Sequence, residues 1–359
     1  MSPRGIRKRA REWLTPLTAV AAAILVLNIL SWSFGQAPAS TLSTAVAGSW
    51  GTLYGIGQVL FKATPLLLAG IAVDVALRAG MFNIGVEGQI AVGSVAAAAF
   101  ALLIPPSLPA VVAVPLVLTV GALAGGFWAA IAGAMRVMFG AHEVITTIML
   151  NRIADAIIAV LLTSALALPG TVRTADMPAN TLLPRLQAIS AGFKGSAASL
   201  AFPLSIVVLA AVFLWLRHTR SGREVQWVGL NEHACAAEGV PVRWRRFAAM
   251  SLSGAIGGLA ASGTVLGYKG YYEMGLGAGV GFGGIAVAFL GRGNPVGLLL
   301  AALLFGTLAQ AGLAINAQVP REAMGVLEAV VIIVTALAAR AGVSEPTTAA
   351  RTPATERDP

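Results

Sequence analysis

Four polar residues recur at every fourth position within one apolar segment of this sequence. Glu143, Thr147, Asn151 and Asp155 would lie along one side of an α-helix, because residues four apart share a helical face. At 1.5 Å per residue the stripe covers about 18 Å, more than half the thickness of a bilayer core. Polar groups that face lipid are costly, so we expect the stripe to face other helices or a wet cavity. Both a transport pathway and hydrogen-bonded helix packing fit this pattern.

A second polar group lies in a glycine-broken segment, residues 80–89 (GMFNIGVEGQ), and residues 275–284 (GLGAGVGFGG) are interrupted in the same way. Non-helical backbone inside a bilayer is tolerated only where it is buried or lines a cavity. Paired interruptions in two halves of a chain are typical of a transport pathway, although small residues also permit close helix packing. The candidate pathway residues are Asn83, Glu87, Gln89, Glu143, Thr147, Asn151 and Phe282.

The motifs of the common enzyme classes are incomplete in this chain. His142 and Glu143 begin like a zinc-protease helix, but Thr146 stands where the second histidine of HExxH belongs. Three histidines and a single cysteine, Cys235, argue against a metal centre and a disulfide framework. The glycine run lacks the Lys-Ser/Thr of a nucleotide-binding loop. We therefore expect no catalytic residue, metal or cofactor, and no ATP hydrolysis by this chain.

The elements that must position these residues are membrane spans. The chain of 359 residues is 57% hydrophobic and 11% charged, whereas soluble domains carry about 25% charged residues. No polar stretch is long enough for a soluble domain, so the sequence predicts an all-α polytopic membrane protein with about ten helices. The expected spans, of which the third and eighth are short and glycine-broken, are 14–34, 53–73, 87–104, 110–135, 144–168, 199–216, 247–267, 279–291, 295–315 and 323–340.

The distribution of arginine predicts the orientation of these spans. Residues 1–13 are basic and should lie in the cytoplasm, and a first apolar body of about 20 residues is long for a cleaved signal peptide. Ten crossings then place the tail 341–359, which has a disordered composition, inside as well. The membrane domain is 14–340, and its longest outer loop is 169–198. Orientation explains the net charge of +9 better than nucleic-acid binding does.

One cytoplasmic loop, residues 217–246, holds six arginines and three glutamates between long apolar runs. Within it, the segment NEHACAAEG predicts a short helix that is capped at Asn231 and ends at Gly239. A small helix on the cytoplasmic face suits docking to a soluble partner. The alternative is an arginine cluster that serves orientation alone.

Five sequence blocks together resemble the permease subunits of bacterial ATP-binding-cassette (ABC) importers for nucleosides and simple sugars. They are RAGMFNIGVEGQ (78–89), HEVITTIMLN (142–151), VGLNEHACAAEGV (228–240), FAAMSLSGAIGGLA (247–260) and GFGGIAVAFLGRGNPVGLLLAALLFG (281–306). The resemblance covers about residues 50–340 and rests on the order and spacing of the blocks. The second block and the long N-terminus look like the longer of two paired permeases, which implies a paralogous second permease as partner.

The resemblance implies a multi-pass protein of the bacterial inner membrane, surrounded by lipid, in which two permeases of about ten helices enclose a pathway. It also implies a separate ATPase subunit and an extracytoplasmic substrate-binding protein that docks on the outer loops, chiefly 169–198. A cytoplasmic coupling helix maps to Asn231–Gly239, where Ala236, Ala237 and Gly239 would fill a groove on the ATPase. Glu232 or Glu238 would meet a basic residue there. The family usually has an aromatic residue mid-segment, whereas this chain has His233-Ala234-Cys235.

Several functions compete at this point. The leading prediction is the permease subunit of an ABC importer for a nucleoside or related solute, with ribose-type sugars and branched-chain amino acids open as alternatives. An ion-coupled carrier could use Asp74, Asp155 or Glu328 as a proton site, although a hydrogen-bonding role is favoured for Asp74 and Glu328. A channel would need no energy source. An intramembrane enzyme would need a nucleophile–base pair that the sequence does not offer.

Overall fold

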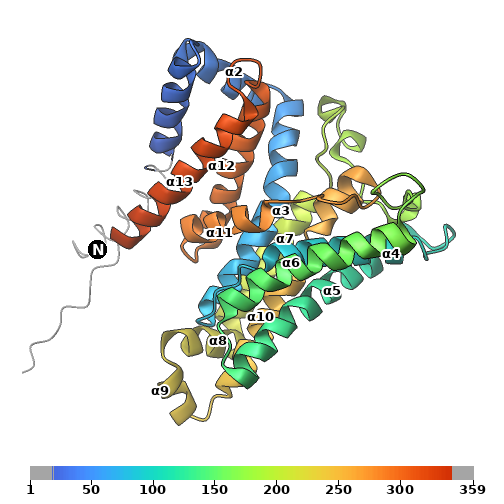
Figure 1. The fold of residues 1–359 in the computed structure, drawn as a ribbon, viewed down its shortest axis with the longest axis vertical. Coiled ribbons are helices and arrows are strands. Elements are labelled where there is room, and N and C mark those ends of the chain that lie inside the picture. Colours follow the sequence, from blue (N-terminus) through green and yellow to red (C-terminus); the bar gives the residue numbers. More distant parts are fainter. Residues whose placement is uncertain (1–17, 19, 342–359) are drawn as a thin grey trace, which may run out of the picture.

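The computed structural model describes residue 18 and residues 20–341, and every regular element in that part of the chain is a helix (Figure 1). The basic segment 1–13 and, apart from Ala341, the tail 341–359 lie outside the described residues. The long helices are α3 (Leu53–Arg78), α5 (Ala110–Phe139), α6 (Glu143–Leu161), α7 (Ala201–His218), α10 (Val242–Gly258), α12 (Pro295–Ala314) and α13 (Arg321–Ala341). The shorter ones are Val20–Ser33, α2 (Pro38–Trp50), α4 (Val86–Ala101), α8 (Arg220–Leu230), α9 (Glu232–Ala237) and α11 (Val280–Gly291).

In the part of the chain that the structure describes, ten apolar helices overlap the ten predicted spans. Six of them are long and apolar enough to cross a bilayer, counting the π-helical ends that extend α6 to Leu166 and α10 to Lys269. The other four are shorter apolar helices, Val20–Ser33, Val86–Ala101, Val280–Gly291 and Ala323–Val334. The all-α polytopic class is therefore confirmed, including the shortness of the two glycine-broken segments.

Two helices were not expected from hydropathy. α2 begins with proline at its first position, where the missing N–H costs nothing, but its serines and threonines keep its hydropathy low. α8 carries arginines and a glutamate and lies in the arginine-rich loop 217–246, where only the short helix now called α9 was predicted. A hydropathy scan with a window of the length of one membrane span therefore detects neither helix.

The centre of the bundle is formed by α3 and α10. In each of them 78% of the most apolar window is buried, compared with 28–33% in α5, α6 and α7. Small residues allow α10 to approach its neighbours closely: a Cβ added at Gly93 of α4 would come within 2.5 Å of the Cα of Gly258. Such close backbone packing is typical of helix interfaces in membranes, where apolar bulk alone provides no driving force.

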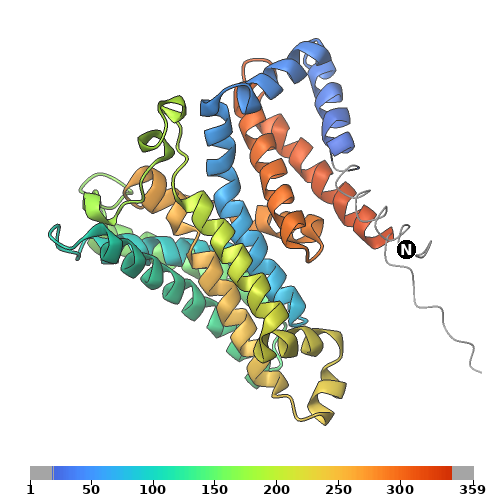
Figure 2. The same cartoon turned by 180° about the vertical axis from the view of Figure 1, so that it is seen from behind.

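The two ends of the bundle differ in what they carry. α8 and α9 project from one end, while α2 and the connection 169–198, with three short 3₁₀ turns, lie at the other (Figures 1 and 2). The arginine-rich loop and the long outer loop thus lie at opposite ends. This is the arrangement that the predicted orientation requires.

Candidate functional site

The turn between α3 and α4 is organised by Asn83. Its Oδ1 accepts the N–H of Gly85 at 2.9 Å, and its Nδ2 donates to Gln89 Oε1 at 2.9 Å and to Ser253 Oγ at 2.8 Å. Gln89 Nε2 returns a hydrogen bond to Asn83 Oδ1 at 3.0 Å. Asn83 and Gln89 are almost fully buried, so these bonds satisfy amides that would be costly without partners. The network fastens the beginning of α4 to α10.

Asn151 joins α6 to the same turn. Its Oδ1 accepts the N–H of Gly88 at 2.9 Å, and its Nδ2 donates to the carbonyl of Ile84 at 3.1 Å. Thr147 is buried one turn earlier, and its hydroxyl donates to Val144 O within the same helix. Glu143, also buried, lies 3.4 Å from Arg136 Nε. These three predicted residues therefore face other parts of the protein.

Asp155 departs from the buried face of this stripe. Its side chain is 59% exposed, and it pairs with Arg152 on the same helix at 3.7 Å. The expectation that the stripe faces other helices is thus met by its first three members and not by its fourth. That these residues line a transport pathway stays a prediction.

Asn151 and Asp155 form a matched pair for testing the packing role. Asn151→Ala should lower the free energy of unfolding by about 1–3 kcal/mol, because it leaves the buried Gly88 N–H without its acceptor. Asp155→Ala removes an exposed ion pair and should cost about 0–1 kcal/mol. Thermal unfolding in detergent together with uptake per molecule measures both effects. A large loss of turnover with unchanged stability in Asn151→Ala would assign this residue to the pathway instead.

Glu87 connects the two glycine-broken segments. Its carboxylate accepts the N–H of Gly279 at 2.5 Å and that of Gly281 at 2.7 Å, at the first turn of α11. The N-terminus of a helix offers unpaired N–H groups and a partial positive charge, both of which a carboxylate satisfies. Gly279 precedes this turn with φ +85°, which residues other than glycine rarely adopt. Phe282, 53% exposed, lies in the same turn, so Glu87 and Phe282 come together.

Arg78, the first residue of the sequence block 78–89, connects three elements of the fold. Its Nε pairs with Asp74 Oδ2 at 2.7 Å, its Nη1 donates to Gln226 Oε1 of α8 at 3.2 Å, and its Nη2 donates to the carbonyl of Gly293 at 2.6 Å. Gly293 lies in the turn between α11 and α12. Arg78 therefore ties α3 both to α8 and to the end of α11. The buried acid Asp74 is held in this ion pair, which is the structural role that was favoured for it, whereas the side chain of Glu328 lies outside the described part.

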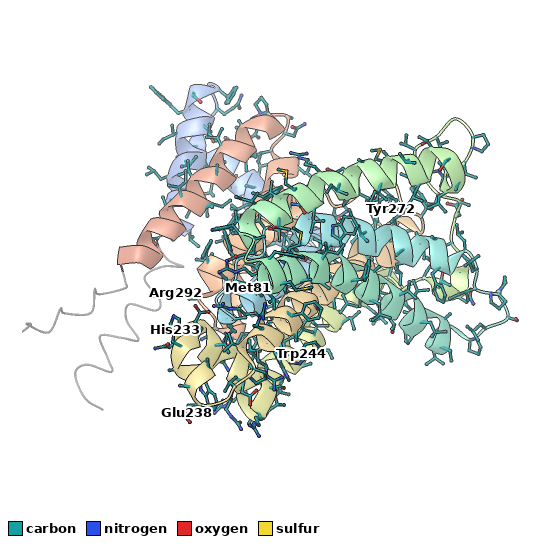
Figure 3. All side chains as sticks on the ribbon, turned by 60° about the horizontal axis from the view of Figure 1, so that its bottom comes forward. Met81, His233, Glu238, Trp244, Tyr272 and Arg292 are labelled. Carbon is teal, nitrogen blue, oxygen red and sulfur yellow. The ribbon has the colours of Figure 1, made fainter. Side chains whose placement is uncertain are left out.

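The short helix α9 has the predicted form. Asn231 Oδ1 accepts the N–H of Ala234 at 3.0 Å, and the chain turns away after the helix at Gly239, where φ is +75°. The outward surface of α9 carries Ala236, Ala237 and Glu238, all exposed, and His233 and Glu238 project from it in Figure 3.

Glu232 has a partner within the chain. It pairs with Arg246 of α10 at 2.5 Å and lies 3.9 Å from His233 Nε2. Cys235, the lone cysteine, belongs to α9 and is its buried residue. Of the two glutamates expected to meet a partner protein, Glu232 is thus already engaged, while Glu238 is exposed.

Glu224 fixes α8 against α10, a contact that sequence reasoning missed. It accepts from Arg220 Nε at 2.7 Å and from Arg245 at 2.6 Å while its own side chain is buried. The hydrogen bond from Arg220, followed by the one from Arg245, holds the pKa of Glu224 below its ordinary value. α8 and α9 therefore form one unit with the N-terminal end of α10.

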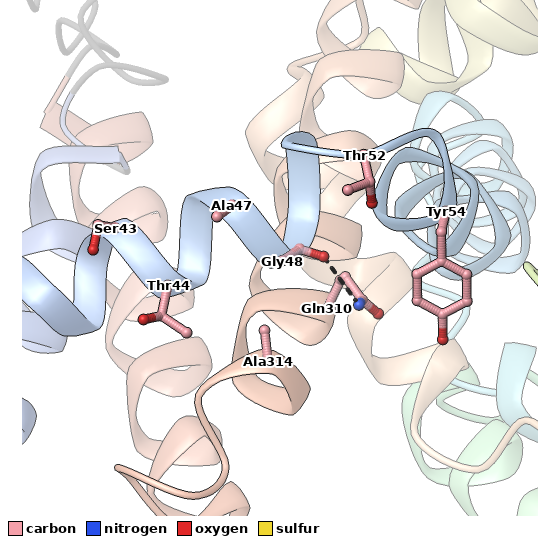
Figure 4. A pocket seen from close by; sticks show the side chains of 8 residues that line it. All are labelled: Ser43, Thr44, Ala47, Gly48, Thr52, Tyr54, Gln310 and Ala314. Carbon is pink, nitrogen blue, oxygen red and sulfur yellow. Dashed lines mark hydrogen bonds between the residues drawn. The ribbon is translucent and has the colours of Figure 1, made fainter. Parts of the chain in front are cut away.

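A cavity of about 610 Å³, drawn in Figure 4, is lined by residues of α2, α3 and α12. It lies at the end of the bundle opposite α9, where α2 is seen in Figure 1. Its polar lining residues are Ser43, Thr44, Thr52, Tyr54 and Gln310. Gln310 donates to Gly48 O at 3.4 Å and accepts from Lys62 Nζ at 3.0 Å, which ties α12 to α2 and α3. No predicted pathway residue lines this cavity. Within residues 20–341 no cluster of His, Cys, Asp and Glu could hold a metal ion.

Comparison with known proteins gives a consistent result. Residues 55–336 match a family described as branched-chain amino acid transport system / permease component. The chain is 36% identical over 335 residues to the guanosine ABC transporter permease protein NupP of Bacillus subtilis (strain 168), covering 91% of this chain and 93% of the relative. It is 31% identical over 342 residues to the glucose ABC transporter permease protein TsgB13 of Haloferax volcanii, covering 91% and 88%. A second guanosine ABC transporter permease protein of Bacillus subtilis, NupQ, is 27% identical over 257 residues, covering 70% and 79%.

Proposed function

The chain belongs to the family of branched-chain amino acid transport system permease components, transmembrane subunits of ABC importers in the bacterial inner membrane, and on that premise we propose that it conducts nucleosides or closely related solutes. The observation that carries the choice of solute is the 36% identity to a guanosine permease protein along 91% of this chain. The family itself excludes a catalytic role for the chain.

We infer three protein partners. A separate ATPase subunit grips α9, with Ala236, Ala237 and Gly239 in its groove; the exposure of these residues at the arginine-rich end supports this. Glu238 then meets a basic residue of the ATPase, because Glu232 is neutralised by Arg246. A second, paralogous permease completes the pathway, and the occurrence of two guanosine permease proteins in one bacterium supports this pairing. An extracytoplasmic binding protein delivers solute to the outer end, chiefly to 169–198.

The contacts of Arg78 suggest how a movement of α9 reaches the solute. α9 packs on α8, and Gln226 of α8 is hydrogen-bonded to Arg78, which also holds the Gly293 carbonyl after α11. The other end of α11 is held by Glu87. α11 is thus a helix of 12 residues that is anchored by a cation after its C-terminus and by an anion at its N-terminus. A displacement of α8 would be transmitted to α11 as a tilt.

The solute would then pass along the exposed side of this helix. Phe282 offers an aromatic face and Glu87 a carboxylate that is partly exposed, a pair that can stack on a base and accept hydrogen bonds from it. The interior residues Asn83, Gln89, Glu143, Thr147 and Asn151 would hold this wall of the pathway in place. Binding here should be weak, because a tight site would delay release.

The decisive test is transport by the purified complex. The full-length chain, isolated with the subunits that co-purify with it and reconstituted with the binding protein, should accumulate labelled guanosine only when ATP is supplied. An uncoupler should leave uptake unchanged. Accumulation by vesicles that hold this chain alone, or uptake abolished by the uncoupler, would refute the proposal in favour of an ion-coupled carrier.

A simple sugar is the second candidate solute, because a glucose permease protein is 31% identical to the chain. The two candidate solutes are distinguished by measuring the uptake of labelled guanosine into the same vesicles in the presence of an excess of unlabelled glucose, ribose or leucine. Nucleoside transport requires that none of these three reduces guanosine uptake.

A further inference from the structure

Three arginines surround a small cavity where the cytoplasmic ends of α5 and α10 meet. Arg136 and Val137 line it from α5, and Val242, Arg243 and Arg246 line it from α10. Its volume is about 130 Å³, whereas one water molecule takes about 30 Å³ in the liquid. The cavity can therefore hold a group larger than a single water molecule.

The charges around this cavity do not cancel. Glu143 pairs with Arg136 at 3.4 Å, and Glu232 pairs with Arg246 at 2.5 Å. Arg243 forms no ion pair with the described residues; its Nε, at 3.0 Å, and its Nη2, at 2.5 Å, donate to the carbonyl of Val137. Three guanidinium groups against two carboxylates leave one positive charge in excess, which favours an anionic occupant.

One hydrogen-bond donor at this place has no acceptor. Nε of Arg246 is buried and makes no hydrogen bond with the described residues. A buried donor without a partner is costly, and in folded proteins it usually marks a place where an atom outside the chain supplies the acceptor. An anionic oxygen in the cavity would meet this requirement and the excess charge together.

The position of the cavity in the membrane identifies the source of such an oxygen. α5 has 30 residues and rises about 45 Å, so its last turn extends beyond a hydrocarbon core of about 30 Å into the headgroup region. Met138 and Phe139 beside the cavity are 65% and 75% exposed, as expected of apolar side chains at the boundary between headgroups and acyl chains. Trp244 next to Arg243 is 58% exposed, and tryptophan is typical of the membrane–water interface (Figure 3).

We propose that this three-arginine cavity binds the phosphate of an anionic phospholipid from the cytoplasmic leaflet. The acyl chains lie along the exposed face of α5, and basic pockets between helices on the cytoplasmic side are suited to such headgroups. Arg246 links the bound phosphate to Glu232, so the lipid steadies the position of α9. This site does not depend on which solute the protein transports.

The test compares two arginine variants of the full-length chain, purified with its co-purifying subunits. Arg243→Gln removes the excess charge, and Arg223→Gln is the matched control, because Arg223 is also exposed in the same loop and also donates to a backbone carbonyl. The thermal midpoint is measured in phosphatidylcholine vesicles with increasing phosphatidylglycerol, and native mass spectrometry counts the retained phosphatidylglycerol. The unmodified protein and Arg223→Gln should respond saturably, whereas Arg243→Gln should need about tenfold more phosphatidylglycerol.

A second variant covers the case in which Arg243→Gln fails to fold. Val242→Phe narrows the cavity without changing its charge and should also lose the response to phosphatidylglycerol. Equal responses of all variants would overturn the proposal. Protection by inorganic phosphate as strong as that by phosphatidylglycerol would identify a site for free anions instead. A response that appears only after the co-purifying ATPase subunit has been removed would identify a carboxylate of that subunit as the true occupant.

Discussion

Replacing Ala236 with proline should abolish solute uptake while the protein remains in the membrane. Proline inside a helix costs about 3 kcal/mol, since it removes one backbone hydrogen bond and clashes with the preceding turn. α9 has only six residues and cannot absorb this cost. Its outward face is not part of the membrane core, so insertion and folding of the spans should be unaffected. ATP-dependent uptake per amount of protein in the membrane measures the effect.

Two further substitutions at this position distinguish the effect of the helical backbone of α9 on uptake from the effect of its surface. Ala236→Ser keeps the backbone N–H and should leave uptake near that of the unmodified protein. Ala236→Trp keeps the helix but fills the groove of a docked partner, so it should also stop uptake and weaken co-purification of the ATPase. Undiminished uptake in the proline variant would show that α9 is not the coupling element.

The sequence was most informative where the determining interactions are local. Spans of apolar residues were located correctly because burial in lipid depends on composition within about 20 residues. The helix after Asn231 was predicted for the same reason: the cap bonds the residue three positions on, and the stop is the conformation of Gly239 itself. Both devices lie within nine residues of sequence.

The orientation of Asp155 shows where a local rule loses accuracy. Four residues advance 400° around a helix with 3.6 residues per turn, so a stripe with period four drifts by about 40° at each step. Between Glu143 and Asp155 the drift reaches about 120°, which carries Asp155 from the buried face to the surface. A stripe of four residues was therefore too long to be read as one face.

Contacts between segments that are distant in the sequence could not be predicted from the sequence. Glu87 bonds N–H groups 192 and 194 residues away, and Arg78 bonds a carbonyl 215 residues away. One recognised block, 78–89, begins with Arg78 and contains Glu87, but nothing in the block states that its two charges hold the two ends of α11. The pairing of Glu232 with Arg246 is of the same kind, so a glutamate expected to meet a partner protein is engaged within the chain.

The second large effect is expected from replacing Arg78. Arg78→Gln should lower the free energy of unfolding by about 3–5 kcal/mol, because it leaves the buried carboxylate of Asp74 without its partner. Uptake should fall as well, but a destabilised protein would lose uptake for trivial reasons. The informative variant is Asp74→Asn combined with Arg78→Gln, which removes the uncompensated charge and should recover most of the stability.

If Arg78 transmits movement from α8 to α11, the double variant should be stable, but its ATP hydrolysis should no longer drive transport. The reason is that the bonds of Arg78 to Gln226 and to the Gly293 carbonyl are missing in it. ATP hydrolysis should continue while solute transported per ATP falls at least about tenfold, the effect of about 1.4 kcal/mol of lost coupling. Glu224→Gln with Arg245→Gln is the matched control, since it removes a buried ion pair at the same end that does not contact α11. An unchanged ratio of solute to ATP in the Asp74–Arg78 variant would reduce Arg78 to a packing residue. Movement would then have to reach α11 by another route, for example through the contacts of α10 with α9 and α3 and of α3 with α11.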